Sequence, residues 1–458
     1  MQECQLLTLL PSRLSCIVLQ EWLTLKSVMA LDSAYCCHSH RSDFLSLLQS
    51  NEYFVREELV IRASVNKLGE TVEGFDVRML ERFGEKLRSV SFQGEFSPAQ
   101  VRSLRQHCHN LTHVSYNDTE AGAFGVWVIL KGNTHIESLN AFLHFFAAGD
   151  LENSLPKLKS LTVCSRKDWH VITTTPMENA CAINAMKLSN SITCLSFSTK
   201  LSPSTLLQIP VLCPHLTSLE ISNADLTDAL LHSITAACPD IVHLDISTNY
   251  SYELTDAGIL SVVQNLKRLQ SLNTLRMPRL TDAALVHIYT HCASTLHTLY
   301  FGCCNDAGPM YSAEAVNTLL QRCTQLRTVH FEENHYSMPI PPGIDLLPAS
   351  LSNITTLVLD GVTCEKTLPI VAEYATNLKV LYIADYTRRS LMPLWNGCPS
   401  LRELYICFKP DMDEKERLDD DFSEFVLFTM DAWMKVRPGL LIQRCNMDLL
   451  EFRAKDMP

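Results

Sequence analysis

The sequence predicts an α/β fold in which short strands and helices alternate along a solenoid, and three observations support this prediction. A six-residue apolar pattern recurs along most of the chain at nearly even spacing. Each copy alternates apolar and polar residues as a β-strand does. The segments between copies carry apolar residues at helical spacing. One such unit cannot bury its apolar faces alone, so neighbouring units must stack.

The repeated segment has the form Leu-x-x-Leu-x-Ile, as in LTSLEI at residues 216–221. Thirteen copies occur, with a mean spacing of about 26 residues, which is typical of leucine-rich repeats. Alternation places the fourth and sixth residues of each copy on one face of the strand and the fifth on the other. The fourth, central apolar residues are, in chain order, Val90, Val114, Leu139, Leu161, Leu195, Leu219, Leu244, Leu275, Leu299, Val329, Leu357, Leu381 and Leu404.

Helices are expected after three threonines that are each followed by aspartate, Thr227, Thr255 and Thr281. Threonine is a good N-cap, and the aspartate behind it favours the positive end of the helix dipole. The apolar residues that follow are spaced i, i+3 and i+7, as on one helix face. These triplets are Leu231, Ile234 and Cys238, then Ile259, Val262 and Leu266, then Leu285, Ile288 and Cys292.

The predicted fold is therefore a right-handed leucine-rich-repeat solenoid with a parallel sheet on its concave side and helices outside. We expect four parts along the chain. They are a helical module at 1–50, a helical linker or N-terminal cap at 51–83, the solenoid of about 13 repeats at 84–410, and an acidic loop with a C-terminal cap at 411–458. Within the last part, a helix followed by a short strand is expected to cover the final repeat.

Composition narrows the class of protein. Apolar residues make up 47% of the chain and charged residues 19%, so it can bury a large core. The net charge of −12 disfavours non-specific binding to nucleic acid or acidic membranes. The first residues lack a basic region ahead of an apolar run, and no stretch of 18 apolar residues occurs. With 18 cysteines in a long chain of this kind, we expect reduced thiols and a cytoplasmic or nuclear location.

Several predicted helices end in cysteine just before the next strand, as in AACPDIVHLDI and GCPSLRELYI. In this respect residues 84–410 resemble the cysteine-containing leucine-rich repeats of F-box proteins. The resemblance is specific for fold and says little about function, because this solenoid serves many roles. The cysteines are expected to be small buried apolar residues. They are Cys108, Cys213, Cys238, Cys292, Cys323 and Cys398.

The segment before the repeats resembles a diverged F-box, a helical motif that begins with Leu-Pro and ends in an apolar-Cys step and a Trp. The final Trp is missing here, and Arg41 or Phe44 stands nearest to its place. The resemblance implies that this segment binds the adaptor of a cullin ubiquitin ligase. The other interpretation is a helical cap that only protects the first repeat. The residues that match the motif are Leu10, Pro11, Ile17, Leu19, Trp22, Leu23, Leu25, Val28, Leu31 and Cys36.

Two cysteines and two histidines in AYCCHSH, residues 34–40, raise the question of a metal site. On a helix, Cys36 and His40 could share one metal, but a structural zinc site needs four ligands. The nearest further cysteines, Cys4 and Cys16, have no standard spacing, so no metal is expected. No phosphate-binding loop, dinucleotide motif, zinc-protease motif or nucleophile elbow occurs either. We therefore expect a protein that is not an enzyme and needs no cofactor.

What remains is a binding surface on the concave face, lined by the fifth residue of each strand. The first such residues are small and polar, the middle ones charged, and four of the last five aromatic. Tyr and Arg are enriched where proteins bind each other tightly. We predict that a target protein contacts this face through Glu220, Asp245, Arg276, Tyr300, His330, Tyr382 and Tyr405.

Two functions from different classes follow. The first is a substrate receptor that joins a target protein to a cullin-RING (SCF-type) ubiquitin ligase. The second is an F-box-free interaction scaffold that resembles ribonuclease-inhibitor-like proteins. A small-molecule sensor is a third, which would require the insertions at 165–187 and 335–349 to form a pocket. The sequence identifies neither the target nor the pathway.

Overall fold

In the computed structural model the chain divides into two compact units, Met1–Ser198 (unit 1) and Thr199–Pro458 (unit 2). The described residues are 58–62, 84–93, 98–116, 127, 129–147, 152–164, 175–222, 226–247, 253–303, 311–333, 351–360, 364–384, 393–394, 397–408 and 441–446. None of the described helices is long and apolar enough to cross a membrane.

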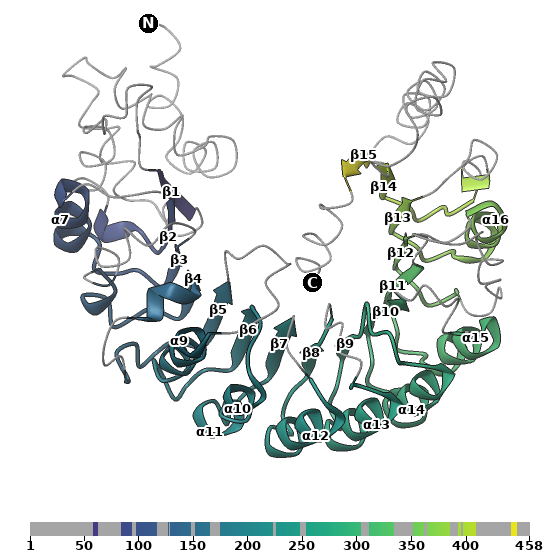
Figure 1. The fold of residues 1–458 in the computed structure, drawn as a ribbon. Coiled ribbons are helices and arrows are strands. Elements are labelled where there is room, and N and C mark those ends of the chain that lie inside the picture. The colour runs from purple at the N-terminus through teal and green to yellow at the C-terminus, as the bar shows by residue number, and fades with distance from the viewer. Residues whose placement is uncertain are drawn as a thin grey trace, which may run out of the picture. The chain divides into compact units, whose positions relative to one another are not determined.

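Unit 1 contains a sheet of parallel strands that pair in chain order (Figure 1). Its strands are β1 (Glu58–Arg62), β2 (Ser89–Gln93), β3 (His113–Tyr116), β4 (Ser138–Phe142), β5 (Ser160–Cys164) and β6 (Cys194–Ser198). Between them lie the helices α7 (Pro98–His107) and α9 (Pro176–Met186) and the 3₁₀ segments η3 (Gly84–Lys86) and η5 (Leu143–Ala147).

Unit 2 repeats this arrangement of parallel strands and intervening helices. Its strands are β7 (Ser218–Ser222), β8 (His243–Asp245), β9 (Ser271–Asn273), β10 (Thr298–Cys303), β11 (Thr328–Glu333), β12 (Thr356–Asp360), β13 (Val380–Ala384), β14 (Glu403–Phe408) and β15 (Leu441–Asn446). Its helices are α10 (Pro203–Leu206), α11 (Ile209–Leu212), α12 (Asp228–Ala237), α13 (Asp256–Asn265), α14 (Asp282–Cys292), α15 (Ala313–Arg322) and α16 (Cys364–Tyr374). Helices α12 to α15 follow one another along one side of the strands (Figure 1).

The predicted α/β solenoid of parallel strands and intervening helices is confirmed. Twelve of the thirteen central apolar residues occupy equivalent places in the strand register. In a typical repeat, Leu244 and Ile246 point into the core and are buried, whereas Asp245 between them is only half-buried. Each such buried aliphatic side chain contributes about 1.5–3 kcal/mol to folding.

The eighth copy was predicted in the wrong register. Leu272, and not Leu275, pairs with Leu244 on one side and Leu299 on the other. The segment LQSLNTLR has leucine at every third position, 269, 272 and 275, so two readings of the six-residue pattern overlap. The correct reading has the more even spacing, 28 and 27 residues to its neighbours instead of 31 and 24.

Paired strands also lie outside the predicted solenoid boundaries. Strand β1 continues the register of β2, with Leu59 opposite Val90. It lies in the segment 51–83, so the expectation of helix there is wrong for Glu58–Arg62. The short strand expected near the C-terminus is β15, whose Ile442 pairs with Leu404.

The three predicted helix starts are confirmed. Hydrogen bonds that the sequence did not reveal connect each helix start to the next. Thr227, Thr255 and Thr281 each accept a hydrogen bond from the backbone of the first helical turn. In addition, Asp228 accepts hydrogen bonds from the backbone N–H and hydroxyl of Thr255, at 2.8 and 2.6 Å. Asp256 does the same for Thr281 at 2.8 and 2.7 Å.

The next helix continues the series, because the carboxylate of Asp282 accepts from the backbone N–H of Ser312, the N-cap of α15, at 2.7 Å. The first aspartate of each helix thus binds the N-cap residue of the following helix. We call this series from α12 to α15 the Asp–Thr ladder. Charge-assisted bonds of this kind are about twice as strong as neutral ones, so the ladder stabilises the stacking of neighbouring repeats.

Candidate functional site

The candidate site lies on the face of the unit 2 sheet opposite the helices, which we call the inner face. Register places the fifth residues of successive strands side by side there. Because neighbouring parallel strands lie about 4.8 Å apart, these side chains form a nearly continuous row. In chain order the row reads Glu220, Asp245, Asn273, Tyr300, His330, Val358, Tyr382 and Tyr405.

The aromatic half of this row is packed and not open. The side chains of Tyr300, His330, Tyr382 and Tyr405 are 7, 4, 4 and 3% exposed. Tyr382 and Tyr405 stack with ring centres 4.1 Å apart, and Tyr300 meets His330 edge to face at 5.6 Å. The hydroxyl of Tyr405 donates to Glu403 at 2.6 Å. The exposed aromatic contact area that the sequence led us to expect is therefore not present in this conformation.

Burial changes the chemistry of two of these side chains. Burial raises the pKa of Tyr300 to about 12, and the nearby Asp245 and Tyr382 add to the shift. Burial also lowers the pKa of His330 to about 3, helped by the positive charge of Arg276. His330 is thus neutral at pH 7, and neither of its ring nitrogens has a hydrogen-bond partner. An unsatisfied buried polar group costs about 1–3 kcal/mol.

Arg276 lies at a different place in the repeat from the one predicted. Because of the corrected register, it lies beyond the end of β9 and is not a strand residue. Its backbone has φ of 63°, a left-handed conformation that is uncommon for a residue other than glycine. Its Nε donates to Glu332 Oε1 at 3.1 Å across two strands, and the two side chains are 24 and 12% exposed. This partly shielded ion pair is screened less by water than a surface pair.

The charged half of the row remains partly accessible. Glu220 and Asp245 lie directly opposite each other in register and are half-buried. Asp245 accepts hydrogen bonds from Asn273 Nδ2 at 2.8 Å and from the backbone N–H of Ser247 at 2.9 Å. Asn273 was missed by the sequence interpretation because of the register error. We call the half-buried set Glu220, Asp245, Asn273, Arg276 and Glu332 the polar inner patch.

The polar inner patch offers carboxylates, an amide and a guanidinium at fixed positions on a rigid sheet. Such groups suit recognition of a polypeptide with complementary charge and hydrogen-bonding groups. Of the seven predicted target-binding residues, three belong to this patch, Glu220, Asp245 and Arg276. The other four form the packed aromatic row beside it.

The predicted adaptor-binding residues, from Leu10 to Cys36, lie outside the described residues. The same holds for the cysteines and histidines of residues 36–40 and for the insertion at 335–349. The insertion at 165–187 contains helix α9, whose N-cap Thr175 and third residue Glu178 form a capping box. Within the described ranges, no group of three or more His, Cys, Asp or Glu side chains could hold a metal ion.

The cysteines at the helix ends are small buried residues, as predicted. Burial raises the pKa of the Cys108, Cys213 and Cys323 thiols to about 12 and that of Cys238 and Cys292 to about 11. Since the thiolate is the reactive form of cysteine, these side chains pack the core and are chemically inert.

Comparison with known proteins gives one curated relative of interest. No family model matches the chain. Over 240 residues, the sequence is 25% identical to the F-box protein FBX14 of Arabidopsis thaliana. The match covers 49% of this chain and 37% of the relative, so this chain spans little more than a third of that protein's length.

Two solved structures are also similar. The yeast Rad7 and Elc1 complex contains a chain with 14% identity and a TM-score of 0.48, and the match covers 84% of this chain and 90% of that one. The leucine-rich repeat-containing protein LegL7 from Legionella pneumophila has 15% identity and a TM-score of 0.38, with coverage of 62 and 92%. The resemblance to F-box proteins that the sequence indicated is thus matched by a curated F-box relative.

Proposed function

We propose that this protein is a non-catalytic substrate receptor of a cullin-RING (SCF-type) ubiquitin ligase. The observation that carries the proposal is the similarity to an F-box protein in a chain that folds as a leucine-rich-repeat solenoid. In this proposal the F-box-like residues from Leu10 to Cys36 bind the ligase adaptor. The inner face of unit 2 binds the target protein.

The polar inner patch is the part of the inner face that best fits a target-binding role. Glu220, Asp245 and the Arg276–Glu332 pair are half-buried, so they retain accessible surface. Hydrogen bonds hold Asp245 and the Arg276–Glu332 pair in place. Groups held in one geometry lose little entropy on binding. The packed row of Tyr300, His330, Tyr382 and Tyr405 supports the patch from one side and fixes the sheet beneath it.

The receptor would act by position alone. Binding the target and the adaptor at once converts transfer of ubiquitin to a target lysine into an intramolecular encounter with a high effective concentration. No acid, base or nucleophile of the receptor is needed for this role. The inert thiols and the neutral, buried His330 are compatible with it.

Adaptor binding can be tested by co-purification of the SCF-type adaptor with the full chain and with a form lacking residues 1–50. We expect the full chain alone to retain the adaptor in a stoichiometric complex. Retention by neither form would leave the interaction scaffold as the better account, with N-terminal helices that only cap the solenoid.

Target binding can be tested by proximity labelling in cells that express the full chain. Glu220→Lys reverses a charge in the polar inner patch, and Glu314→Lys makes the same change on the exposed surface of α15. We expect the first variant to lose a specific set of labelled proteins and the second to keep it. Alanine in place of the buried tyrosines would be a poor test, because removing a packed aromatic ring costs about 3–5 kcal/mol of stability.

A further inference from the structure

A second charged surface lies in unit 1, at the edge of the sheet where strands β2 to β5 begin. Backbone hydrogen bonds fix the spacing there: the N–H of Thr112 donates to Arg88 O, that of Glu137 to Thr112 O, and that of Lys159 to Glu137 O, each at 2.8 Å. The residues that lead into successive strands are therefore held in a row, one strand spacing of about 4.8 Å apart.

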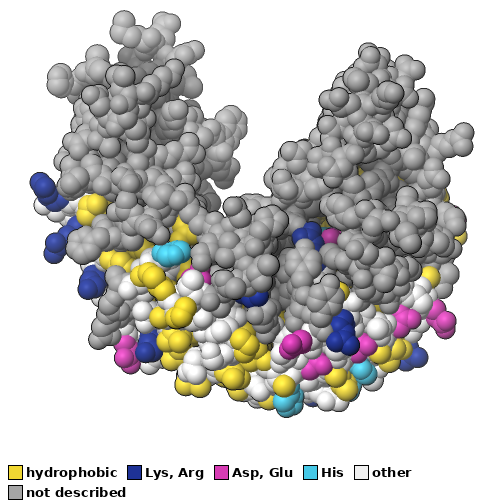
Figure 2. Space-filling model, in the orientation of Figure 1, with side chains coloured by type: hydrophobic (Ala, Val, Ile, Leu, Met, Phe, Trp, Pro, Cys, Tyr) yellow, Lys and Arg dark blue, Asp and Glu magenta, His cyan; other side chains and the backbone are white. Residues whose placement is uncertain are grey.

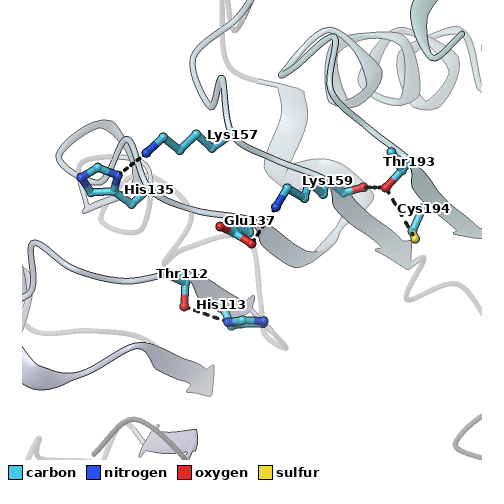
Figure 3. Close-up of polar contacts among 8 residues, drawn as sticks. All are labelled: Thr112, His113, His135, Glu137, Lys157, Lys159, Thr193 and Cys194. Atoms are coloured by element: carbon cyan, nitrogen blue, oxygen red, sulfur yellow. Dashed lines mark hydrogen bonds and ion pairs between the residues drawn. The ribbon is translucent and has the colours of Figure 1, made fainter. Parts of the chain in front are cut away.

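This row is rich in basic side chains, shown in part in Figure 3. We call Arg88, His113, His135, Lys157 and Lys159 the basic edge. Arg88 is half-buried and the other four are exposed. Lys and Arg side chains are visible on the viewed surface of unit 1 (Figure 2).

The contacts along the basic edge leave positive charge uncompensated. Lys159 pairs with Glu137 at 3.2 Å (Figure 3). Lys157 Nζ lies 2.9 Å from His135 Nδ1, and since an ammonium group can only donate, the imidazole nitrogen accepts in this arrangement. Of the three permanent cations in this row, Lys159 pairs with Glu137, and Glu85 lies in the turn whose backbone accepts from Arg88. Lys157 has no ion pair with a described carboxylate.

The equivalent positions in unit 2 hold an ion pair between an acidic and a basic side chain. His135 and Lys157 each directly precede the first apolar residue of a repeat segment, and so do Asp240 and Arg268. In unit 2 the two side chains form an acid–base pair, with Arg268 Nη1 3.7 Å from Asp240 Oδ1. In unit 1 the acid of this pair is replaced by an imidazole, so the lysine lacks a carboxylate at the equivalent position.

We propose that the basic edge of unit 1 is a docking surface for an acidic polypeptide segment of a partner protein, distinct from the inner face of unit 2. Nucleic acid and acidic membranes carry negative charge over a wide area, which the net charge of −12 repels, whereas a short acidic segment places its charge on the basic edge alone. From Arg88 in the approach to β2 to Lys159 in the approach to β5 is three strand spacings, about 14 Å, which an extended segment of four or five residues covers. Exposed groups of opposite charge raise the rate of association and fix the register of a bound segment.

The test uses the full chain and a fluorescent glutamate-rich peptide, with binding measured by anisotropy at low and at physiological salt. Lys157→Glu with Lys159→Glu reverses the charge of both lysines of the basic edge. Lys267→Glu with Arg268→Glu makes the same change of net charge at the equivalent edge of unit 2. Circular dichroism checks that both variants keep the fold. Arg88 is left unchanged because its side chain donates to the backbone of Asn110 at 3.1 Å.

We expect wild-type protein to bind the peptide, with an affinity that falls as salt rises. The unit 1 variant should bind at least about tenfold more weakly, and the unit 2 control within about twofold of wild type. Equal loss in both variants, or no binding by wild type at low salt, would overturn the proposal. Equally tight binding of single-stranded DNA of the same charge would also overturn it, because the edge would then attract any polyanion.

Discussion

The Asp–Thr ladder makes a quantitative prediction about what holds neighbouring repeats together. Replacing Asp228 with alanine removes both hydrogen bonds to Thr255, at 2.8 and 2.6 Å, and leaves the Thr255 N–H without its acceptor in a partly buried place. Hydrogen bonds to a charged group are worth about 1.5–3 kcal/mol each, and the two are not additive because they share one carboxylate. The carboxylate also stabilises the N-terminus of α12 by about 0.3–1 kcal/mol.

The expected loss is therefore about 2–4 kcal/mol for Asp228→Ala, against a smaller loss for Asp228→Asn, which keeps one acceptor oxygen. The assay is urea denaturation of the full chain followed by circular dichroism, in which a lower midpoint at constant slope reports lost stability. Asp240→Ala is the matched control. Its ion pair with Arg268 is long, at 3.7 Å, and both side chains are about 70% exposed, so its loss should cost less than about 1 kcal/mol. If Asp228→Ala and Asp240→Ala lower the midpoint equally, the ladder does not stabilise the stack as argued.

Three further predictions follow from buried groups. Burial lowers the pKa of His330 to about 3, so wild type loses stability as pH falls from about 6.5 toward 3. His330→Phe should remove this loss. The difference in melting temperature between variant and wild type should therefore grow from pH 7.5 to pH 5. An unchanged difference would contradict this. Alanine in a helix is normally about 1 kcal/mol more favourable than glycine. Gly258→Ala should nevertheless lower the stability of the protein, because the added Cβ would collide with the Asp228 carboxylate and the Leu254 side chain. A rise in the urea midpoint would refute this prediction. Burial raises the pKa of the Cys213 and Cys323 thiols to about 12. In the native protein both should therefore react with iodoacetamide at pH 8 far more slowly than the half-buried Cys194, as measured by mass spectrometry. Equal rates would show that these thiols are exposed to solvent.

The periodic parts of this fold could be predicted from the sequence because each repeat carries the same physical signal. Apolar residues at the fourth and sixth positions and a Thr–Asp helix start both report local requirements, burial on one face and capping of one helix end. The prediction failed where the local signal is ambiguous. In LQSLNTLR the leucine at every third position permits two registers, and only pairing with Leu244 and Leu299 selects Leu272.

The sequence predicts which residues lie on the inner face, but it does not predict whether their side chains are exposed or buried. Alternation correctly placed Tyr300, Tyr382 and Tyr405 opposite the core, yet it gives no information about what packs against that face, and the rings are buried. The Arg276–Glu332 pair could not be foreseen, because it depends on a left-handed backbone at Arg276 and joins residues 56 positions apart in sequence. The same holds for the Asp–Thr ladder, in which partners lie 25 to 30 residues apart.

The affinity of the full chain for the purified SCF-type adaptor tests most directly whether this protein connects an adaptor to a target. Isothermal titration compares wild type with a variant carrying Leu10→Ala, Pro11→Ala and Trp22→Ala, while circular dichroism verifies that the solenoid is retained. We expect saturable one-to-one binding by wild type and at least about a tenfold weaker affinity for the variant, since buried aromatic and apolar anchors dominate such interfaces. Absence of binding by wild type, or equal binding by both forms, would contradict it.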